Sequence, residues 1–190
     1  MNRLENWFCG STVWRMVTER KILPWMVSGY ALGESVLELG AGPGASTAEL
    51  RRRAKRVTSL EYDRSFAARL GARYKNTNVS VLQGDAAALP FADGTFSSVI
   101  AVLVLHHLKS REQQEMAFAE VHRVLRPGGA FLAFEIGDGW LQRVGHIKST
   151  FVPIAPASAF SRLTSLGFSK IVVDMQRAAF RICALRAREA

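Results

Sequence analysis

The chain has 190 residues, 48% of them hydrophobic, which is enough for one three-layer domain with a sizeable core. Its formal net charge of +9 favours acidic partners such as nucleic acid, anionic lipid or anionic metabolites, although the basic residues are dispersed except in the run 51–56. The two cysteines, Cys9 and Cys183, lie too far apart in the sequence to suggest a disulfide framework or a zinc site. We therefore expect reduced thiols and no bound metal.

The sequence shows no segment typical of export or membrane insertion. Charged residues are scattered over its first twenty positions, so no uncharged apolar run like that of a signal peptide occurs there. The longest apolar run, Val99–Leu105, is too short to cross a bilayer. We expect a cytoplasmic protein without a transmembrane segment.

Residues 1–33 precede the first expected strand and predict an N-terminal helical extension. Apolar residues recur at three- and four-residue steps over 3–19, which indicates a helix with one apolar stripe. Pro24 is expected to interrupt this helix, and a second short helical piece follows over 25–27. The extension would either pack on the edge of the sheet or over the ligand cleft, or form a lid that touches a membrane or grips the substrate.

From Val36 onward, short apolar strands alternate with amphipathic helices. The expected strands are 36–39, 57–60, 79–82, 98–105 and 130–135. The expected helices are 45–54, 64–74 and 111–124, with Asp63 and Ser110 as the N-caps of the last two. Such alternation predicts a parallel sheet with helices on both faces, and the continuously apolar fourth strand favours a central position.

The alternation lapses after Glu135. Residues 136–155 are expected to be irregular, and a helix over 157–166 is followed by strands 169–175 and 179–186. The short connection between these last strands predicts an antiparallel final hairpin. The predicted fold is α/β: a doubly wound, Rossmann-like, seven-stranded and mostly parallel sheet. It forms a single domain over 1–190, with a cofactor-binding core at 34–135 and a substrate-side segment at 136–190.

A glycine-rich turn follows the first strand. Gly40, Gly42 and Gly44 leave no side chain on the turn, so the backbone can approach a ligand closely. The helix that follows directs its free N–H groups toward that ligand, which predicts a nucleotide-like molecule with an anionic group. The turn also satisfies a loose dinucleotide fingerprint with Glu61, so it does not by itself identify the cofactor.

The residues at the carboxyl ends of the other strands indicate which kind of cofactor the site binds. Glu61, after the second strand, can accept hydrogen bonds from a ribose diol, and Asp85, after the third, can accept one from an adenine amine. Both carboxylates suit a positively charged cofactor and would repel the phosphates of a dinucleotide. The phosphate-binding sequence Gly-Lys-Ser/Thr does not occur.

Five segments in order resemble the motifs of the class I S-adenosylmethionine-dependent methyltransferases, and the last two resemble the branch typified by the ubiquinone/menaquinone methyltransferases. They are 38–44, 60–61, 83–91, 96–108 and 123–129. Ser97 departs from the pattern of this family, whose members usually have Asp at this position. The resemblance implies S-adenosylmethionine as the cofactor and the following contact residues: Glu38, Gly40, Ala41, Gly42, Gly44, Glu61, Tyr62, Asp85, Ala86 and Leu105.

Methyl transfer is an in-line displacement at a sulfonium, and it needs a general base only when the acceptor arrives protonated. His106 and His107 at the end of the fourth strand are the candidate catalytic residues, and His146 is a third. The motifs of DNA amino- and cytosine-methylating enzymes do not occur, which favours a small-molecule or lipid-like acceptor. Two alternatives stay open: a nucleic-acid methyltransferase, and a non-catalytic S-adenosylmethionine-binding protein.

Overall fold

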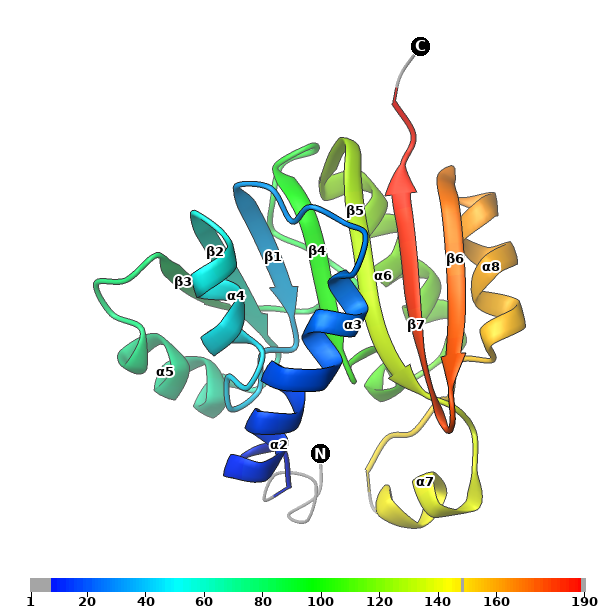
Figure 1. Cartoon of the computed structure of the whole chain (residues 1–190), viewed down its shortest axis with the longest axis horizontal. Coiled ribbons are helices and arrows are strands. Elements are labelled where there is room, and N and C mark those ends of the chain that lie inside the picture. The colour runs from blue at the N-terminus through cyan, green and yellow to red at the C-terminus, as the bar shows by residue number, and fades with distance from the viewer. Residues whose placement is uncertain (1–7, 148, 189–190) are drawn as a thin grey trace.

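The protein is built on one seven-stranded sheet, described here from a computed structural model for residues 8–147 and 149–188 (Figure 1). The strand order is β3-β2-β1-β4-β5-β7-β6. β1 to β5 are parallel, and β7 runs antiparallel to both β5 and β6, as the sequence predicts. The strands are β1 Ser35–Leu39, β2 Arg56–Glu61, β3 Val79–Gln83, β4 Phe96–Val102, β5 Leu125–Ile136, β6 Phe168–Gln176 and β7 Ala179–Arg186.

Helices follow most of the parallel strands and also precede β1. Asp63 caps α5 by accepting hydrogen bonds from the N–H groups of Ser65 and Phe66, and Ser110 caps α6 through Gln113, as expected. The elements are α2 Thr12–Val17, the π-helix η1 Thr18–Ile22, α3 Leu23–Val27, α4 Thr47–Arg53, α5 Arg64–Arg73, the 3₁₀-helix η2 Leu105–His107, α6 Arg111–Val124, α7 Trp140–Gly145 and α8 Pro156–Ser165.

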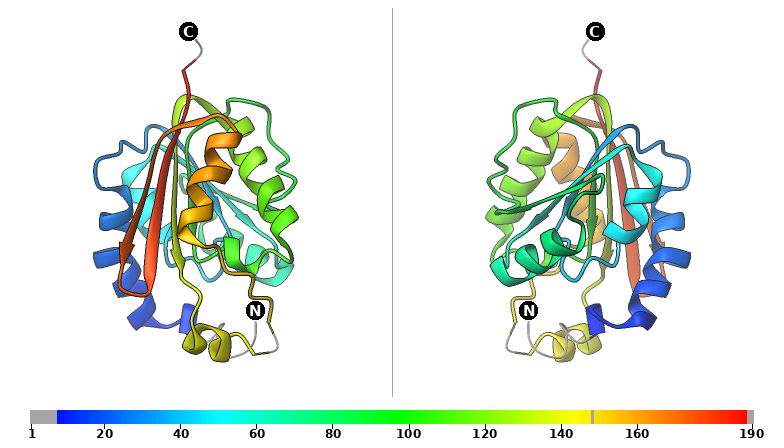
Figure 2. Two further views of the ribbon diagram at one scale, coloured as in Figure 1. Left: turned by 90° about the vertical axis from the view of Figure 1, so that its right-hand side faces the viewer. Right: turned by 90° about the vertical axis from the view of Figure 1, so that its left-hand side faces the viewer.

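Helices cover both faces of the sheet (Figure 2), and each face carries its own apolar core. Alternate strand residues point to opposite faces, so Leu37 joins the core beneath α6 and α8 while Val36 joins the core beneath α3, α4 and α5. Fully buried Phe118 on α6 and Met26 on α3 fill these two layers. The predicted three-layer arrangement is confirmed.

The N-terminal extension differs from its prediction. Pro24 does not interrupt the helix: the backbone is helical from Thr12 to Val27, and Pro24 lies in the first turn of α3, where a missing N–H costs little. The irregularity falls just before it, in the π-helical turn η1, where Leu23 N–H bonds to the Thr18 carbonyl. Residues 3–7 of the expected helix lie outside the described residues.

Three further predicted boundaries were wrong. β4 ends at Val102, and Leu105–His107 forms the 3₁₀-helix η2, because the backbone turns at Leu103 with a φ of +56°. β5 begins at Leu125, although its regular pairing with β4 resumes at Ala130 after a register shift. The segment 136–155 contains α7, a short helix that its glycines concealed.

Ser97, the residue that departs from the methyltransferase pattern, joins β4 to the chain before β1. Its hydroxyl lies 2.7 Å from the carbonyl oxygens of both Leu32 and Ser35 and accepts a hydrogen bond from Ser35 N–H at 3.0 Å. This contact is at the amino end of the strands, so the departure serves the packing of the extension rather than the carboxyl edge.

The strand order reverses at β1, which lies between β2 and β4. In open α/β sheets ligands bind at this switch point, beyond the carboxyl ends of the strands. The glycine turn after β1 and η2 after β4 therefore share this edge with α2 and α7 (Figure 1). Within residues 8–147 and 149–188, no helix has both the length and the apolar character needed to cross a membrane.

Candidate functional site

The glycine turn has a conformation that other residues adopt with strain. Gly40 and Gly42 have φ of +61° and +51°. A Cβ on Gly40 would lie 2.5 Å from the Val104 side chain, whereas a Cβ on Gly42 would meet nothing within 4 Å. Gly40 thus permits close packing inside the protein, and Gly42 presents bare backbone to open space.

Glu38 lies beneath this turn and holds it in place. The carboxylate is 1% exposed and accepts hydrogen bonds from the hydroxyls of Ser46, Thr47 and Ser59 at 2.5–2.6 Å. Burial raises the pKa of Glu38, and the three hydroxyl donors partly oppose that rise. The geometry supports a role for Glu38 in orienting the residues that follow the turn.

Glu61 is also part of the turn. One carboxylate oxygen accepts the Gly42 N–H at 2.7 Å, and the other accepts the Asp63 N–H at 2.8 Å. Its neighbour Tyr62 is 63% exposed, with the Lys109 ammonium 6.0 Å from its ring centre. Glu61 therefore couples the end of β2 to the backbone of the glycine turn and retains lone pairs directed along the same edge.

The residues after β3 form a compact turn. Asp85 accepts the Ala87 N–H at 2.9 Å and is half-buried, while Ala86 is 8% exposed and belongs to the core. Leu105 does not lie where the sequence places it. Its side chain is fully buried in the core beneath α6, because η2 turns it away from the cavity.

A cavity of about 380 Å³ connects the glycine turn to η2. Its polar edge is formed by Gly40, Gly42 and the histidines of η2, and its apolar walls include Trp14, Phe134 and Ile136. The N-terminal extension and the segment after β5 thus enclose the space that the strand ends leave open. The volume is within the range of small-molecule sites.

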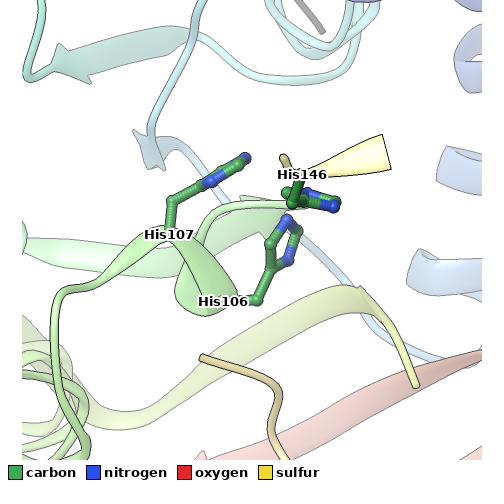
Figure 3. A group of neighbouring side chains, drawn as sticks. All are labelled: His106, His107 and His146. Carbon is green, nitrogen blue, oxygen red and sulfur yellow. The ribbon is translucent and has the colours of Figure 1, made fainter. Parts of the chain in front are cut away.

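Three histidines gather at one end of this cavity (Figure 3). The ring centres of His106 and His107 are 4.2 Å apart, and those of His106 and His146 are 5.1 Å apart. His146 also stacks on Phe151 at 4.4 Å. The sequence named each histidine as a candidate, but the cluster depends on a contact between η2 and a segment about forty positions later in the chain.

Glu135, which the sequence analysis did not single out, orients His106. One of its oxygens lies 2.5 Å from His106 Nδ1, and the other accepts the N–H groups of Val104 and Leu105 at 2.9 and 2.8 Å. Both side chains of the pair are at most 2% exposed. The sequence signal that could have identified Glu135 is an acidic residue near the carboxyl end of β5, because ligands bind beyond the carboxyl ends of parallel strands.

A second buried network fastens the segment after α7 to η2. The Gln114 amide donates to the carbonyls of Leu105 and Val152 at 3.1 and 2.8 Å. Val152 N–H in turn donates to the His106 carbonyl at 2.8 Å. Arg162 on α8 donates to the Gln114 amide oxygen at 3.1 Å, so α8 also supports the contact between η2 and the segment after α7. The backbone of η2 is therefore held by the core of the protein.

The doubly wound sheet, the glycine turn beneath its cavity and the acids at two strand ends define a nucleotide-cofactor-binding α/β domain. Residues 37–133, 97 of the 190, match the family described as "Methyltransferase domain". The chain belongs to this family.

Individual relatives agree with this family. The chain is 32% identical over 124 residues to demethylmenaquinone methyltransferase of Corynebacterium kroppenstedtii, covering 65% of this chain and 48% of the relative. It is 33% identical over 115 residues to the ubiquinone/menaquinone biosynthesis C-methyltransferase UbiE of Klebsiella pneumoniae, covering 57% and 45%. The chain thus matches about half the length of these relatives.

The fold also occurs in a solved methyltransferase structure that contains S-adenosyl-L-homocysteine. N-methyltransferase NodS of Bradyrhizobium japonicum, in complex with S-adenosyl-L-homocysteine, superposes with a TM-score of 0.73. The superposition covers 96% of each chain at 22% sequence identity. At this identity the likeness concerns the fold.

Proposed function

We propose that this protein transfers a methyl group from S-adenosylmethionine to a small, largely apolar acceptor. The observation that carries the proposal is the single cavity that joins the bare backbone of Gly42 to the histidines of η2. One end suits the cofactor, and the other suits an acceptor that needs a polar group next to apolar walls. The quinone methyltransferases among the relatives support an acceptor of this kind.

The cofactor lies along the carboxyl ends of β1, β2 and β3 in this proposal. The backbone of Gly40, Ala41, Gly42 and Gly44 passes beneath its methionine and ribose portion, and Glu38 anchors the residues after this turn through the hydroxyls of Ser46 and Thr47. Glu61 and Tyr62 face the ribose. Asp85 and Ala86 receive the adenine. Leu105 supports η2 from the core rather than touching the cofactor.

The reaction breaks the bond between the sulfonium sulfur and the methyl carbon and forms one between that carbon and the acceptor. Sulfur leaves as a neutral thioether, and the acceptor's proton passes to His106. Glu135 is a positioning residue, because its carboxylate orients the His106 ring and stabilises the imidazolium that forms. His107 contributes to the wall of the acceptor space.

The dispersed basic charge supports a nucleic-acid substrate less well. In the basic run on α4, Arg52 pairs with Glu19 and Glu49, and Arg53 also pairs with Glu49. These ion pairs reduce the positive field available to a phosphate backbone. RNA and DNA are therefore included as comparison acceptors in the following experiment.

The test supplies S-adenosylmethionine with a deuterated methyl group and separate acceptor panels: prenylated quinols, simple phenols, and RNA or DNA. Mass spectrometry then follows S-adenosylhomocysteine and the labelled product. We expect label in a quinol or phenol. Label only in nucleic acid, or bound cofactor without turnover on any panel, would contradict the proposal and would support one of the other two readings.

Two variants separate chemistry from binding. His106→Ala should lower kcat by about 10²–10⁴-fold, the usual contribution of a general base, while S-adenosylhomocysteine affinity in calorimetry stays unchanged. His122→Ala is the matched control, because His122 lies on α6 against Phe168, with ring centres 4.9 Å apart, outside the cavity. Equal activity in both variants would remove His106 from the mechanism.

A further inference from the structure

We propose that His106, His107 and His146 form a binding site for a divalent transition-metal ion of the zinc type. One ring nitrogen from each histidine lies within 4.8 Å of those of the other two. The site is inferred from the three imidazoles and their hydrogen bonds, and this inference does not depend on the methyl transfer proposed above, although a bound metal would occupy the His106 lone pair that the proposed proton transfer uses. Sequence spacing alone gave no expectation of a metal, because two ligands come from η2 and the third follows α7 (Figure 3).

The hydrogen bonds at Nδ1 support this assignment. His106 Nδ1 contacts the Glu135 carboxylate at 2.5 Å, His107 Nδ1 the Thr150 carbonyl at 3.1 Å, and His146 Nδ1 the Gln142 carbonyl at 2.6 Å. Carbonyl and carboxylate oxygens accept, so each Nδ1 is the donor, and the lone pair of each neutral ring is then on Nε2. A metal-ligating histidine typically donates its other N–H to such an oxygen.

The ligand type and spacing favour the zinc class. Neutral imidazole suits Zn²⁺, Co²⁺ and Ni²⁺ better than the hard cations, which prefer oxygen ligands. Zinc–nitrogen bonds of about 2.0–2.1 Å in a tetrahedron place the ligand nitrogens about 3.4 Å apart. One nitrogen of each ring lies within 4.8 Å of those of the other two, so the rings must move closer together to bind an ion. His107 and His146 are only half-buried, which leaves room for that movement.

A three-histidine site leaves the fourth tetrahedral position for another ligand. All three histidines line the same cavity as the glycine turn, so that position opens toward the proposed acceptor. This consequence rests on the proposed function: a bound ion would occupy the lone pair of His106, so His106 would no longer be the proton acceptor, and the ion would instead lower the pKa of the acceptor's oxygen or sulfur. The metal site can still be tested without cofactor or acceptor.

The experiment titrates Co²⁺ into the full chain, freed of any polyhistidine tag, and follows binding by visible absorption and calorimetry. We expect one equivalent with the intense absorption of four-coordinate cobalt, which Zn²⁺ then displaces. His146→Ala should weaken binding by at least about 100-fold, more than the 10–100-fold typical of losing an outer hydrogen bond. Thermal unfolding of this variant confirms that it folds.

His122→Ala is the matched control and should bind Co²⁺ like the wild type, because His122 belongs to α6 and lies outside the cluster. No stoichiometric Co²⁺ binding by the wild type would overturn the metal site. So would a His146→Ala variant that binds as tightly as the wild type, or a His122→Ala variant that loses binding equally. None of these outcomes alters the mass-spectrometric test of methyl transfer, so the two proposals fail separately.

Discussion

The two sides of the cavity are built differently. On the cofactor side, the acids beneath the turn are almost completely buried, with Glu38 and Glu61 at 1% and 8% exposure, and their oxygens are held by hydroxyl or backbone donors. On the opposite side, α2 and α7 are short helices that carry exposed apolar side chains, including Met16 and Trp140 at 42% and 72% exposure.

This contrast separates a preorganised half from an adaptable half. A buried polar network is stable only when every member is satisfied, so the turn geometry is strongly determined. Short helices with few buried apolar contacts open at low free energy, which suits segments that must admit an acceptor. Methyltransferase relatives with different acceptors would then share the first half and differ in the second.

Among the residues around the cavity, the largest effect on stability is expected at Glu38. Glu38→Leu keeps a similar volume but leaves the hydroxyls of Ser46, Thr47 and Ser59 without their acceptor, so unfolding free energy should fall by about 3 kcal/mol. Urea denaturation monitored by circular dichroism measures the loss. A decrease below about 1 kcal/mol would mean that the turn does not depend on this network.

Glu38→Gln is the control for shape, since the hydroxyls can rotate to satisfy an amide. It also tests the raised pKa. A carboxyl whose pKa is higher in the folded than in the unfolded protein adds stability below the unfolded pKa and loses it as pH rises through the folded pKa. The wild type should therefore lose stability relative to Glu38→Gln as pH rises above the usual glutamate range.

The sequence predicted the strands and the glycine turn well because their determinants are local. Alternating apolar strands, the glycines of 40–44 and the cap at Asp63 each express a preference within a few residues. The strand order and the position of Glu61 follow from these elements together with the general rules for parallel sheets.

The elements around η1, η2 and α7 were predicted poorly because they depend on contacts between residues far apart in the sequence. The π-helical turn before Pro24 and the 3₁₀ turn that buries Leu105 depend on packing against the sheet, which overrides local preference. The pairing of Glu135 with His106 joins positions 29 apart. Sequence periodicity does not reveal such a contact, even though both residues lie at predicted strand ends.

A smaller effect, on the affinity for the cofactor product, is expected at Glu61 and Asp85. Glu61→Ala and Asp85→Ala should each weaken S-adenosylhomocysteine binding by about 1–3 kcal/mol, the cost of unpaired buried polar groups. We expect the greater loss for Glu61→Ala, because it also frees the N–H groups of Gly42 and Asp63. Isothermal titration calorimetry measures both. Unchanged affinity in both variants would refute the proposed cofactor position.

The smallest effect is expected on the acceptor side. Trp140→Ala should change unfolding free energy by less than about 0.5 kcal/mol, because a largely exposed side chain loses little packing. Phe118→Ala is the matched aromatic control within a helix: fully buried between β5 and α6, it should cost about 3–5 kcal/mol. Thermal and urea unfolding of the pair measures how much each half contributes to the folded state. If Trp140→Ala destabilised the protein by more than 1 kcal/mol, α7 would belong to the cooperative core, and the adaptable half would be confined to α2 and the π-helical turn.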